Sequence, residues 1–266
     1  MAPSRRSTEP KDYQDLPQAI GAMAKVFSDG WEIPLHDHIR DQLLYATRGI
    51  MRVRTERQAW IVPRDSAVYL PAGTRHAVAM HGDVDMRTLY IDTAGERTRP
   101  PVLTVIAVSP LLRELILSLS EEPVDYAPES RAGQIAQLIE MEIGRAEALT
   151  VNVPLPADPR LQRVCAGLLA DPSDRRTLDG WSDAAGASPR TLARLFERDL
   201  GMRFNEWRQR VRFHNALEAL ARGAPVGKVA GDHGYRSAGA FTAAFTKIMG
   251  APPTRMRADG RLKTAP

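Results

Sequence analysis

The chain has 266 residues, which is enough for two domains of ordinary size. Hydrophobic residues make up 43% of it, which permits a packed core and excludes wholesale disorder. No apolar run reaches membrane-spanning length and no apolar stretch follows Arg5 and Arg6, so we expect neither a membrane protein nor a secreted one. The lone cysteine, Cys165, excludes an internal disulfide and fits a reducing cytoplasm.

Charge is divided unevenly along the chain. Residues 159–266 hold 19 Lys and Arg against 10 Asp and Glu, a net charge of +9, whereas residues 1–158 have a net charge of −5. A cationic C-terminal module joined to a mildly acidic one is typical of a polyanion binder that carries a separate sensor. A solvated basic surface without a partner would fit the charge equally well, so other signals must decide.

The first predicted elements are strands. Residues 20–92 consist of short apolar or alternating runs separated by turn signals, a pattern that predicts a β-barrel or sandwich. The runs are 42–46, 50–54, 67–70 and 87–91, and the turn signals are 48–49, 63–65, 71–73 and 81–83.

Two amphipathic helices are predicted next, over residues 110–120 and 130–149, joined by a short loop with two prolines. Two interpretations of this helical hairpin are open and compatible: it only covers the barrel, or it also supplies the contact of a homodimer. A proline-containing linker over 151–157 follows. Asp158 and Pro159 then open a further helix as its N-cap and first residue.

The last third of the chain carries one short pattern twice, 49 residues apart. Each copy has a cap serine, apolar residues four apart and a terminal glycine, which describes a short amphipathic helix. The matching pairs are Ser188 and Ser237, Leu192 and Phe241, Phe196 and Phe245, and Gly201 and Gly250. A short helix and a tight turn precede each copy, so each is predicted to be a helix-turn-helix whose second helix can enter a DNA major groove.

These elements predict an α+β protein in which an N-terminal β-barrel and a helical hairpin precede an all-α region with two helix-turn-helix units. The predicted boundaries are a flexible tail over 1–15, the barrel over 16–100, the hairpin over 101–150, the linker over 151–157, the tandem over 158–258 and a tail over 259–266.

From Asp158 onward the chain resembles the AraC/XylS family of bacterial transcription regulators. The resemblance includes both helix-turn-helix units, a long connecting helix over 204–221, Gly234-Tyr235 before Ser237, and the closing Gly250-Ala251-Pro252-Pro253. It implies a sequence-specific regulator of transcription that binds double-stranded DNA, and RNA polymerase if it is an activator. Two units in one chain are expected to meet successive major grooves, roughly 34 Å apart.

The first recognition helix must pack through its apolar side, which consists of Leu192, Leu195 and Phe196. Its outward residues stand where the family reads bases: Arg190, Ala193 and Arg194. Arginine can pair bidentately with guanine, worth about 1–3 kcal/mol of base discrimination, although a phosphate contact is the alternative for each. Thr191 and the helix N-terminus at Ser188 are expected to hold phosphate.

The second recognition helix has a chemically poor outward face, made of Ala238, Gly239, Thr242 and Ala243. Alanine and the Thr242 methyl group can touch a thymine methyl group but make no bidentate contact. Arg236 and Lys247 flank the helix and suit phosphate, as does its start at Ser237. We therefore expect the first helix-turn-helix unit to supply most of the sequence discrimination. The second should chiefly anchor the protein on DNA.

Residues 30–49 resemble the first motif of the cupin family, and residues 65–80 resemble the second. His36, His38 and His76 stand at the family's ligand positions, whereas Gln42 replaces its usual glutamate. Asp65 and Met80 also depart from the usual glycine and asparagine. His36 and His38 alternate on a predicted strand, so both should point into the barrel, where His76 completes a three-imidazole cluster.

Such a cluster suits one divalent transition metal, Ni, Zn, Fe or Cu, to which Gln42 would add only a neutral amide oxygen. The alternative is a polar pocket whose histidines hydrogen-bond an organic effector. The other histidines, His81, His214 and His233, form no comparable cluster and are expected at the surface or in turns.

The combination of a cupin with this tandem resembles the subgroup of nickel-resistance and nitroimidazole-transport regulators, which implies a neighbouring transporter gene as target. We expect an effector-responsive regulator and not an enzyme, because Gln42 replaces the glutamate and no acid–base pair accompanies the histidines. Two other interpretations remain open: a cupin enzyme with a DNA-targeting tail, and a constitutive DNA-bound protein whose cupin is only a dimer scaffold.

Overall fold

A computed structural model of the chain describes residues 7–62, 66–94, 100–149, 152–221, 223–249 and 252–256. The chain divides into two units, one made of residues 1–53 and 62–149 and the other of residues 54–61 and 150–266. The turn predicted at 63–65, Gly250 and the tail over 259–266 lie outside the described residues, as do the first six residues of the N-terminal tail. Within residues 7–15, a short 3-10 helix spans Pro10–Tyr13.

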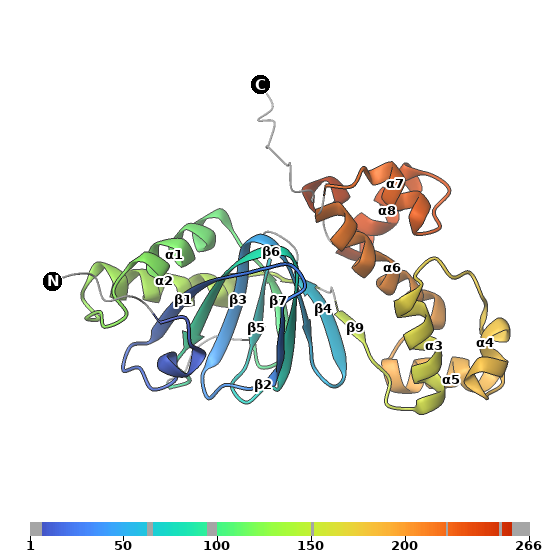
Figure 1. The fold of residues 1–266 in the computed structure, drawn as a ribbon, viewed down its shortest axis with the longest axis horizontal. Coiled ribbons are helices and arrows are strands. Elements are labelled where there is room, and N and C mark those ends of the chain that lie inside the picture. Colours follow the sequence, from blue (N-terminus) through green and yellow to red (C-terminus); the bar gives the residue numbers. More distant parts are fainter. Residues whose placement is uncertain are drawn as a thin grey trace, which may run out of the picture. The chain divides into compact units, whose positions relative to one another are not determined.

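The first unit is built on an antiparallel β-sheet in the order β1-β6-β3-β5-β7-β8, with β2 also paired to β6 (Figure 1). The strands are β1 Ile20–Phe27, β2 Glu32–His36, β3 Asp41–Arg54, β5 Ser66–Leu70, β6 His76–Ile91, β7 Thr104–Ala107 and β8 Ala148–Leu149. The predicted α+β class is confirmed, but among the described residues the sheet does not close into a barrel. β1 and β2 pair with different parts of the long β6, which leaves β1 and β2 at one edge of the sheet and β8 at the other.

Two turns predicted within the strands are wrong. Both β3 and β6 run through the turn signals at 48–49 and 81–83 as continuous strands. Gly49 has φ +78°, and a Cβ atom there would lie 2.6 Å from the Asp83 carbonyl oxygen of the neighbouring strand. The glycine therefore bends the strand without ending it, which is a recognised role of glycine inside a sheet.

The predicted helical hairpin is confirmed as α1 Pro110–Glu121 and α2 Arg131–Arg145. α2 ends four residues earlier than predicted, because Ala148 and Leu149 form β8 and pair with β7. The apolar sides of both helices bury one face of the sheet (Figure 1), packing Leu112, Ile116, Ile135 and Ile139 against Leu43, Tyr45, Leu89 and Ile91. Side chains alternate along a strand, so the intervening residues face the other side of the sheet.

The second unit is helical, with one small strand pair. Its helices are α3 Pro159–Ala170, α4 Leu178–Ala185, α5 Pro189–Leu200, α6 Phe204–Ala221, α7 Val226–Asp232 and α8 Ala238–Met249, followed by a 3-10 turn at Pro253–Met256. α6 spans the residues predicted for the connecting helix. β4 Gln58–Val62 pairs antiparallel with β9 Asn152–Pro154, so part of the predicted linker is a strand.

Two histidines expected at the surface or in turns are buried. His214 lies within α6, which is packed along much of its length, and His233 follows α7 with its Nδ1 2.8 Å from the Val229 carbonyl oxygen. None of the helices in the described ranges is long and apolar enough to cross a bilayer.

We predict that Gly133→Ala destabilises the first unit by about 1–3 kcal/mol, as overpacking does elsewhere. A Cβ atom at Gly133 would lie 2.1 Å from the Pro128 carbonyl oxygen, so the backbone of the α1–α2 loop must shift. Calorimetric melting of the full chain measures the loss. Gly227→Ala is the matched control, because it also lies in the first turn of a helix but has open space around it. Equal melting curves for both variants would contradict the prediction.

Candidate effector pocket and nucleic-acid interface

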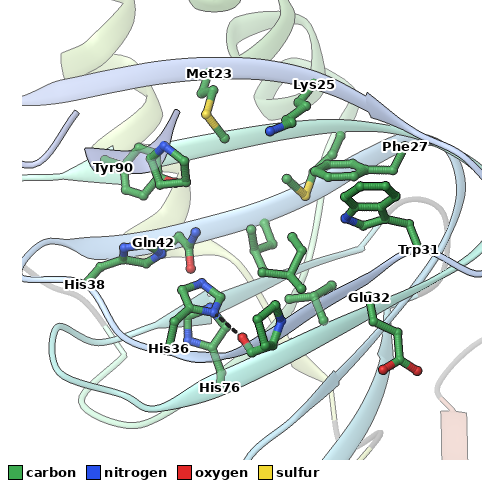
Figure 2. Close-up of a pocket in the computed structure, with 16 residues that line it drawn as sticks. Met23, Lys25, Phe27, Trp31, Glu32, His36, His38, Gln42, His76 and Tyr90 are labelled. Atoms are coloured by element: carbon green, nitrogen blue, oxygen red, sulfur yellow. Dashed lines mark hydrogen bonds between the residues drawn. The ribbon is translucent and has the colours of Figure 1, made fainter. Parts of the chain in front are cut away.

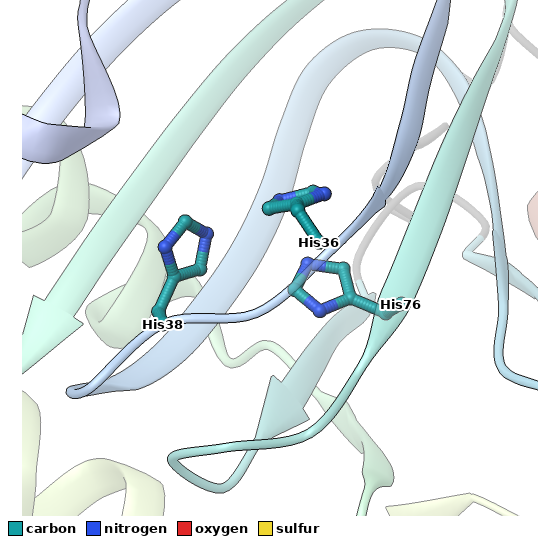
Figure 3. A group of neighbouring side chains, drawn as sticks. All are labelled: His36, His38 and His76. Carbon is teal, nitrogen blue, oxygen red and sulfur yellow. The ribbon is translucent and has the colours of Figure 1, made fainter.

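The three predicted histidines come together in the first unit (Figure 3). His36 ends β2 and pairs in register with His76, which begins β6, while His38 lies in the loop after β2. The ring centroids of His36 and His76 are 4.3 Å apart, and that of His38 lies 4.8 Å from His36 and 5.7 Å from His76. One nitrogen from each ring lies within 4.8 Å of the others.

Backbone carbonyl groups orient two of the rings. The Nδ1 of His36 lies 2.7 Å from the Pro34 oxygen, and the Nδ1 of His76 lies 2.8 Å from the Thr74 oxygen. Because a carbonyl oxygen only accepts, each Nδ1 carries the hydrogen and each Nε2 keeps its lone pair. The Nε2 atoms of His38 and His76 are buried and have no hydrogen-bond partner among the described residues.

His38 and His76 are neutral at pH 7. Burial lowers the pKa of His38 from 6.5 to about 4, and the neighbouring His36 and His76 lower it further, against the opposite influence of Asp37. Burial likewise lowers the pKa of His76 to about 4, although its hydrogen bond to Thr74 acts the other way. Neutral imidazole is the form that binds a metal.

Gln42 and Tyr90 complete this end of the pocket. Burial raises the pKa of the Tyr90 phenol, and a hydrogen bond from Gln42 partly opposes the rise. The other amide atom, Gln42 Oε1, is buried without a hydrogen-bond partner in the described ranges. Three imidazoles and an amide oxygen are a donor set that fits a divalent transition metal.

The cluster forms one end of a cavity of about 230 Å³ (Figure 2). The sequence analysis missed the rest of its wall, which is mostly apolar: Met23, Phe27, Trp31, Ile33, Leu44, Val78 and Met86. Period-two alternation along residues 23–27 was a usable signal for one side of this wall, because Met23, Lys25 and Phe27 share a face of β1. A site with both polar donors and apolar walls can hold a metal or an organic ligand.

In the second unit, α5 presents the residues predicted to read DNA. Ser188 caps it, with its Oγ accepting from the Thr191 backbone nitrogen at 3.2 Å. Leu192, Leu195 and Phe196 are buried, as predicted, and the Phe196 ring lies 5.9 Å from that of Trp207 on α6. The outward residues Arg190, Ala193 and Arg194 are exposed, and Thr191 is half-buried. Their contacts with DNA stay predictions.

The second copy is built in the same way. The Ser237 Oγ accepts from the Ala240 nitrogen at 3.1 Å and caps α8. Phe241 and Phe245 are buried, with ring centroids 5.8 and 5.3 Å from Phe213 of α6. Of the predicted contact residues, Arg236, Ser237, Ala238 and Lys247 are exposed, whereas Thr242 is half-buried.

Comparison with known proteins finds relatives for both the sheet-containing unit and the helical unit. Residues 25–92 match the cupin domain, and residues 181–259 match a helix-turn-helix domain. The HTH-type transcriptional regulator NimR of Escherichia coli (strain K12) is 30% identical over 222 residues, covering 84% of this chain and 81% of that protein. A putative AraC-like transcription regulator of Streptomyces antibioticus is 27% identical over 70% of this chain and 54% of its own length.

The chain belongs to the AraC-type family of transcriptional regulators. It is a DNA-binding AraC-type regulator with a cupin domain, and the α4–α5 and α7–α8 pairs are its helix-turn-helix units. The relatives are transcriptional regulators rather than enzymes, and the absence of catalysis in this chain stays a prediction.

We predict that acid destabilises the first unit between pH 6.5 and pH 4. The pKa values of His38 and His76 are depressed to about 4 in the folded chain, so the unfolded chain binds more protons in this window and stability falls as pH falls. Melting temperatures at half-unit pH steps measure the effect, and His76→Gln should flatten the curve. A melting temperature independent of pH across this window would sink the prediction.

Proposed function

We propose that this AraC-type regulator acts in the cytoplasm and controls a promoter in response to a ligand held by the histidine cluster. One observation supports this proposal above all. A cluster of ligand-binding atoms without hydrogen-bond partners among the described residues lies in one unit, and two capped recognition helices lie in the other. A ligand changes promoter binding only if it binds the two arrangements of the protein unequally. We propose that filling the pocket stiffens the sheet and shifts how α1 and α2 dock on it.

Base discrimination is proposed for α5. Arg190 and Arg194 are exposed on one side of the helix, and Ala193 leaves room between them for a base edge. Ser188 and Thr191 lie at the helix N-terminus, where backbone N–H groups attract phosphate. The guanidinium groups are the long bidentate donors of this face and suit guanine.

Anchoring is proposed for α8. Arg236 and Lys247 are exposed at its two ends and suit phosphate, together with the cap residue Ser237. Ala238 and the half-buried Thr242 offer methyl contacts at most. Changes of base in the half-site facing α8 should therefore cost less affinity than changes facing α5.

The proposed ligand of the cupin pocket is one divalent transition metal, of the class Ni, Zn, Fe or Cu, held by His36, His38 and His76 with Gln42 beside them. The lowered pKa values of His38 and His76 support it. The Nε2 atoms of these two residues and the Oε1 of Gln42 also have no hydrogen-bond partner among the described residues. Such a metal would supply a Lewis-acid centre inside the cavity.

A homodimer through the helical hairpin is also proposed. Leu111 on α1 and Leu138 and Met141 on α2 are large hydrophobic side chains that are exposed rather than packed against the sheet. Exposed apolar groups that gather on one element are typical of a contact surface. If the regulator is an activator, RNA polymerase is a further partner.

Replacing Arg190 and Arg194 together by alanine should reduce discrimination between the operator and single-base variants by about 1–3 kcal/mol per lost contact, about 5- to 150-fold. The operator is first selected from a random DNA library, and affinities are measured by fluorescence anisotropy at fixed salt. Arg236→Ala is the control: it should weaken operator and unrelated DNA alike, because a phosphate contact carries no sequence information. Undiminished selectivity in the double variant would refute the proposed reading face.

Protein purified without chelator should contain about one equivalent of a divalent transition metal by elemental analysis, because a donor set of this kind binds tightly at neutral pH. Removing the metal should change operator affinity, and His36→Ala should lose both the metal and the response. His81→Ala removes a histidine from β6 outside the cluster and should keep both. A wild-type response in His36→Ala would remove the cluster from the sensing mechanism.

A further inference from the structure

The donor set of the pocket is electrically neutral. His36, His38 and His76 offer imidazole nitrogens and Gln42 an amide oxygen, and among the described residues no carboxylate joins the cluster of candidate ligand atoms. A bound divalent cation would therefore keep both its charges inside a partly buried site. Uncompensated charge in such a site is unfavourable, so the site favours any occupant that brings a negative charge.

The carboxylates nearby do not supply this charge. Asp41, next to Gln42 on β3, faces the other side of the sheet, where its oxygens accept from the Tyr69 hydroxyl and the Ala72 nitrogen at 2.8 Å. Asp37 is exposed and does not line the cavity, and Glu32 lines it only from an exposed position. Lys25 also lines the wall, and its ammonium donates to the Thr8 carbonyl oxygen at 3.1 Å and lies 3.9 Å from a Glu9 carboxylate oxygen, so Glu9 is already paired with a cation.

The remainder of the cavity wall is mostly hydrocarbon. Met23, Phe27 and Met86 are buried side chains that line it, and the Trp31 ring stands 6.3 Å from that of Phe27 at the end away from the histidines (Figure 2). Trp31 is 56% exposed and thus lies at the mouth. A bare metal ion would leave this surface uncovered, whereas an organic molecule with an apolar body would cover it.

The volume limits the size of that body. The cavity of about 230 Å³ is smaller than the roughly 300–1,000 Å³ of pockets for drug-sized ligands. A single ring with one anionic group matches both the volume and the division of the wall into a polar and an apolar end.

We propose that this pocket, with a divalent metal in place, selects a small organic monoanion, namely a carboxylate on an apolar body of about one ring. The anion binds at the histidine end and its ring lies along Met23, Phe27, Trp31 and Met86. This inference rests on the metal site of the proposed function and adds the class of organic ligand that the metal-loaded pocket binds.

The test uses the full chain loaded with Zn²⁺ and isothermal titration calorimetry with three probes: benzoate, benzamide and acetate. Benzamide keeps the ring without the charge, and acetate keeps the charge without the ring. We expect benzoate to bind at least about tenfold more tightly than either, and at least about tenfold more tightly than it binds the metal-free chain.

Two variants separate the contributions of the wall and the donor set. Trp31→Ala should weaken benzoate by about tenfold with unchanged zinc affinity, while Ile39→Ala, also an exposed apolar residue but outside the cavity wall, should change neither. Gln42→Glu supplies the missing charge, so it should bind zinc more tightly and lose the preference for benzoate over benzamide. Because Trp31 is largely exposed, its variant keeps the test valid even if Gln42→Glu does not fold.

Equal affinities for benzoate and benzamide, or benzoate binding that persists without metal, would overturn this proposal. Neither result contradicts the proposed function. That proposal fails if the purified chain contains no metal, or if removing the metal leaves operator affinity unchanged. Zinc-dependent benzoate binding that Gln42→Glu abolishes would support the proposal whatever the operator does.

Discussion

Both DNA-reading units depend on ring packing against α6. Trp207, near the start of this helix, holds α5 through Phe196, and Phe213, two turns later, holds α8 through Phe241 and Phe245. The Trp207 Nε1 also donates to the Pro154 carbonyl oxygen at 2.8 Å, which ties β9 to the same core. Because one continuous helix carries all these contacts, α6 sets the spacing of α5 and α8, and a fixed spacing is what the proposed reading of successive grooves requires.

The sensing unit uses the two faces of a sheet for different purposes. One face is sealed by α1 and α2, which gives the sheet its apolar core. The opposite face forms the wall of the cavity, where burial lowers the pKa values of His38 and His76 and keeps both rings neutral. Sealing one face therefore leaves the other free for a ligand, and a single layer of strands separates the cavity from α1 and α2.

Gln42 gives this pocket its particular chemistry. The resembled cupin motif has a glutamate there, and the amide is nearly the same size but uncharged. The Gln42 side chain is buried and lines the cavity, and its Oε1 has no hydrogen-bond partner among the described residues, so the amide oxygen is available as a metal ligand. With glutamine in place of glutamate, the protein supplies one negative charge fewer to a bound metal. A ligand that carries a negative charge would restore the balance.

The sequence by itself determined the features that rest on local signals. These features follow from residues that lie within a few helical turns or one strand of each other. They are the cap serines at 188 and 237, the extent of α6, the buried faces of α5 and α8, and the spacing of the histidines. Only the tertiary structure decided that the strands run through Gly49 and Gly82, that α2 yields its last residues to β8, that the sheet stays open, and that Phe27, Trp31 and Met86 wall the cavity. These outcomes depend on contacts between segments that are far apart in the chain. Strand pairing and side-chain packing across a sheet are set by such neighbours, and local sequence signals do not identify them.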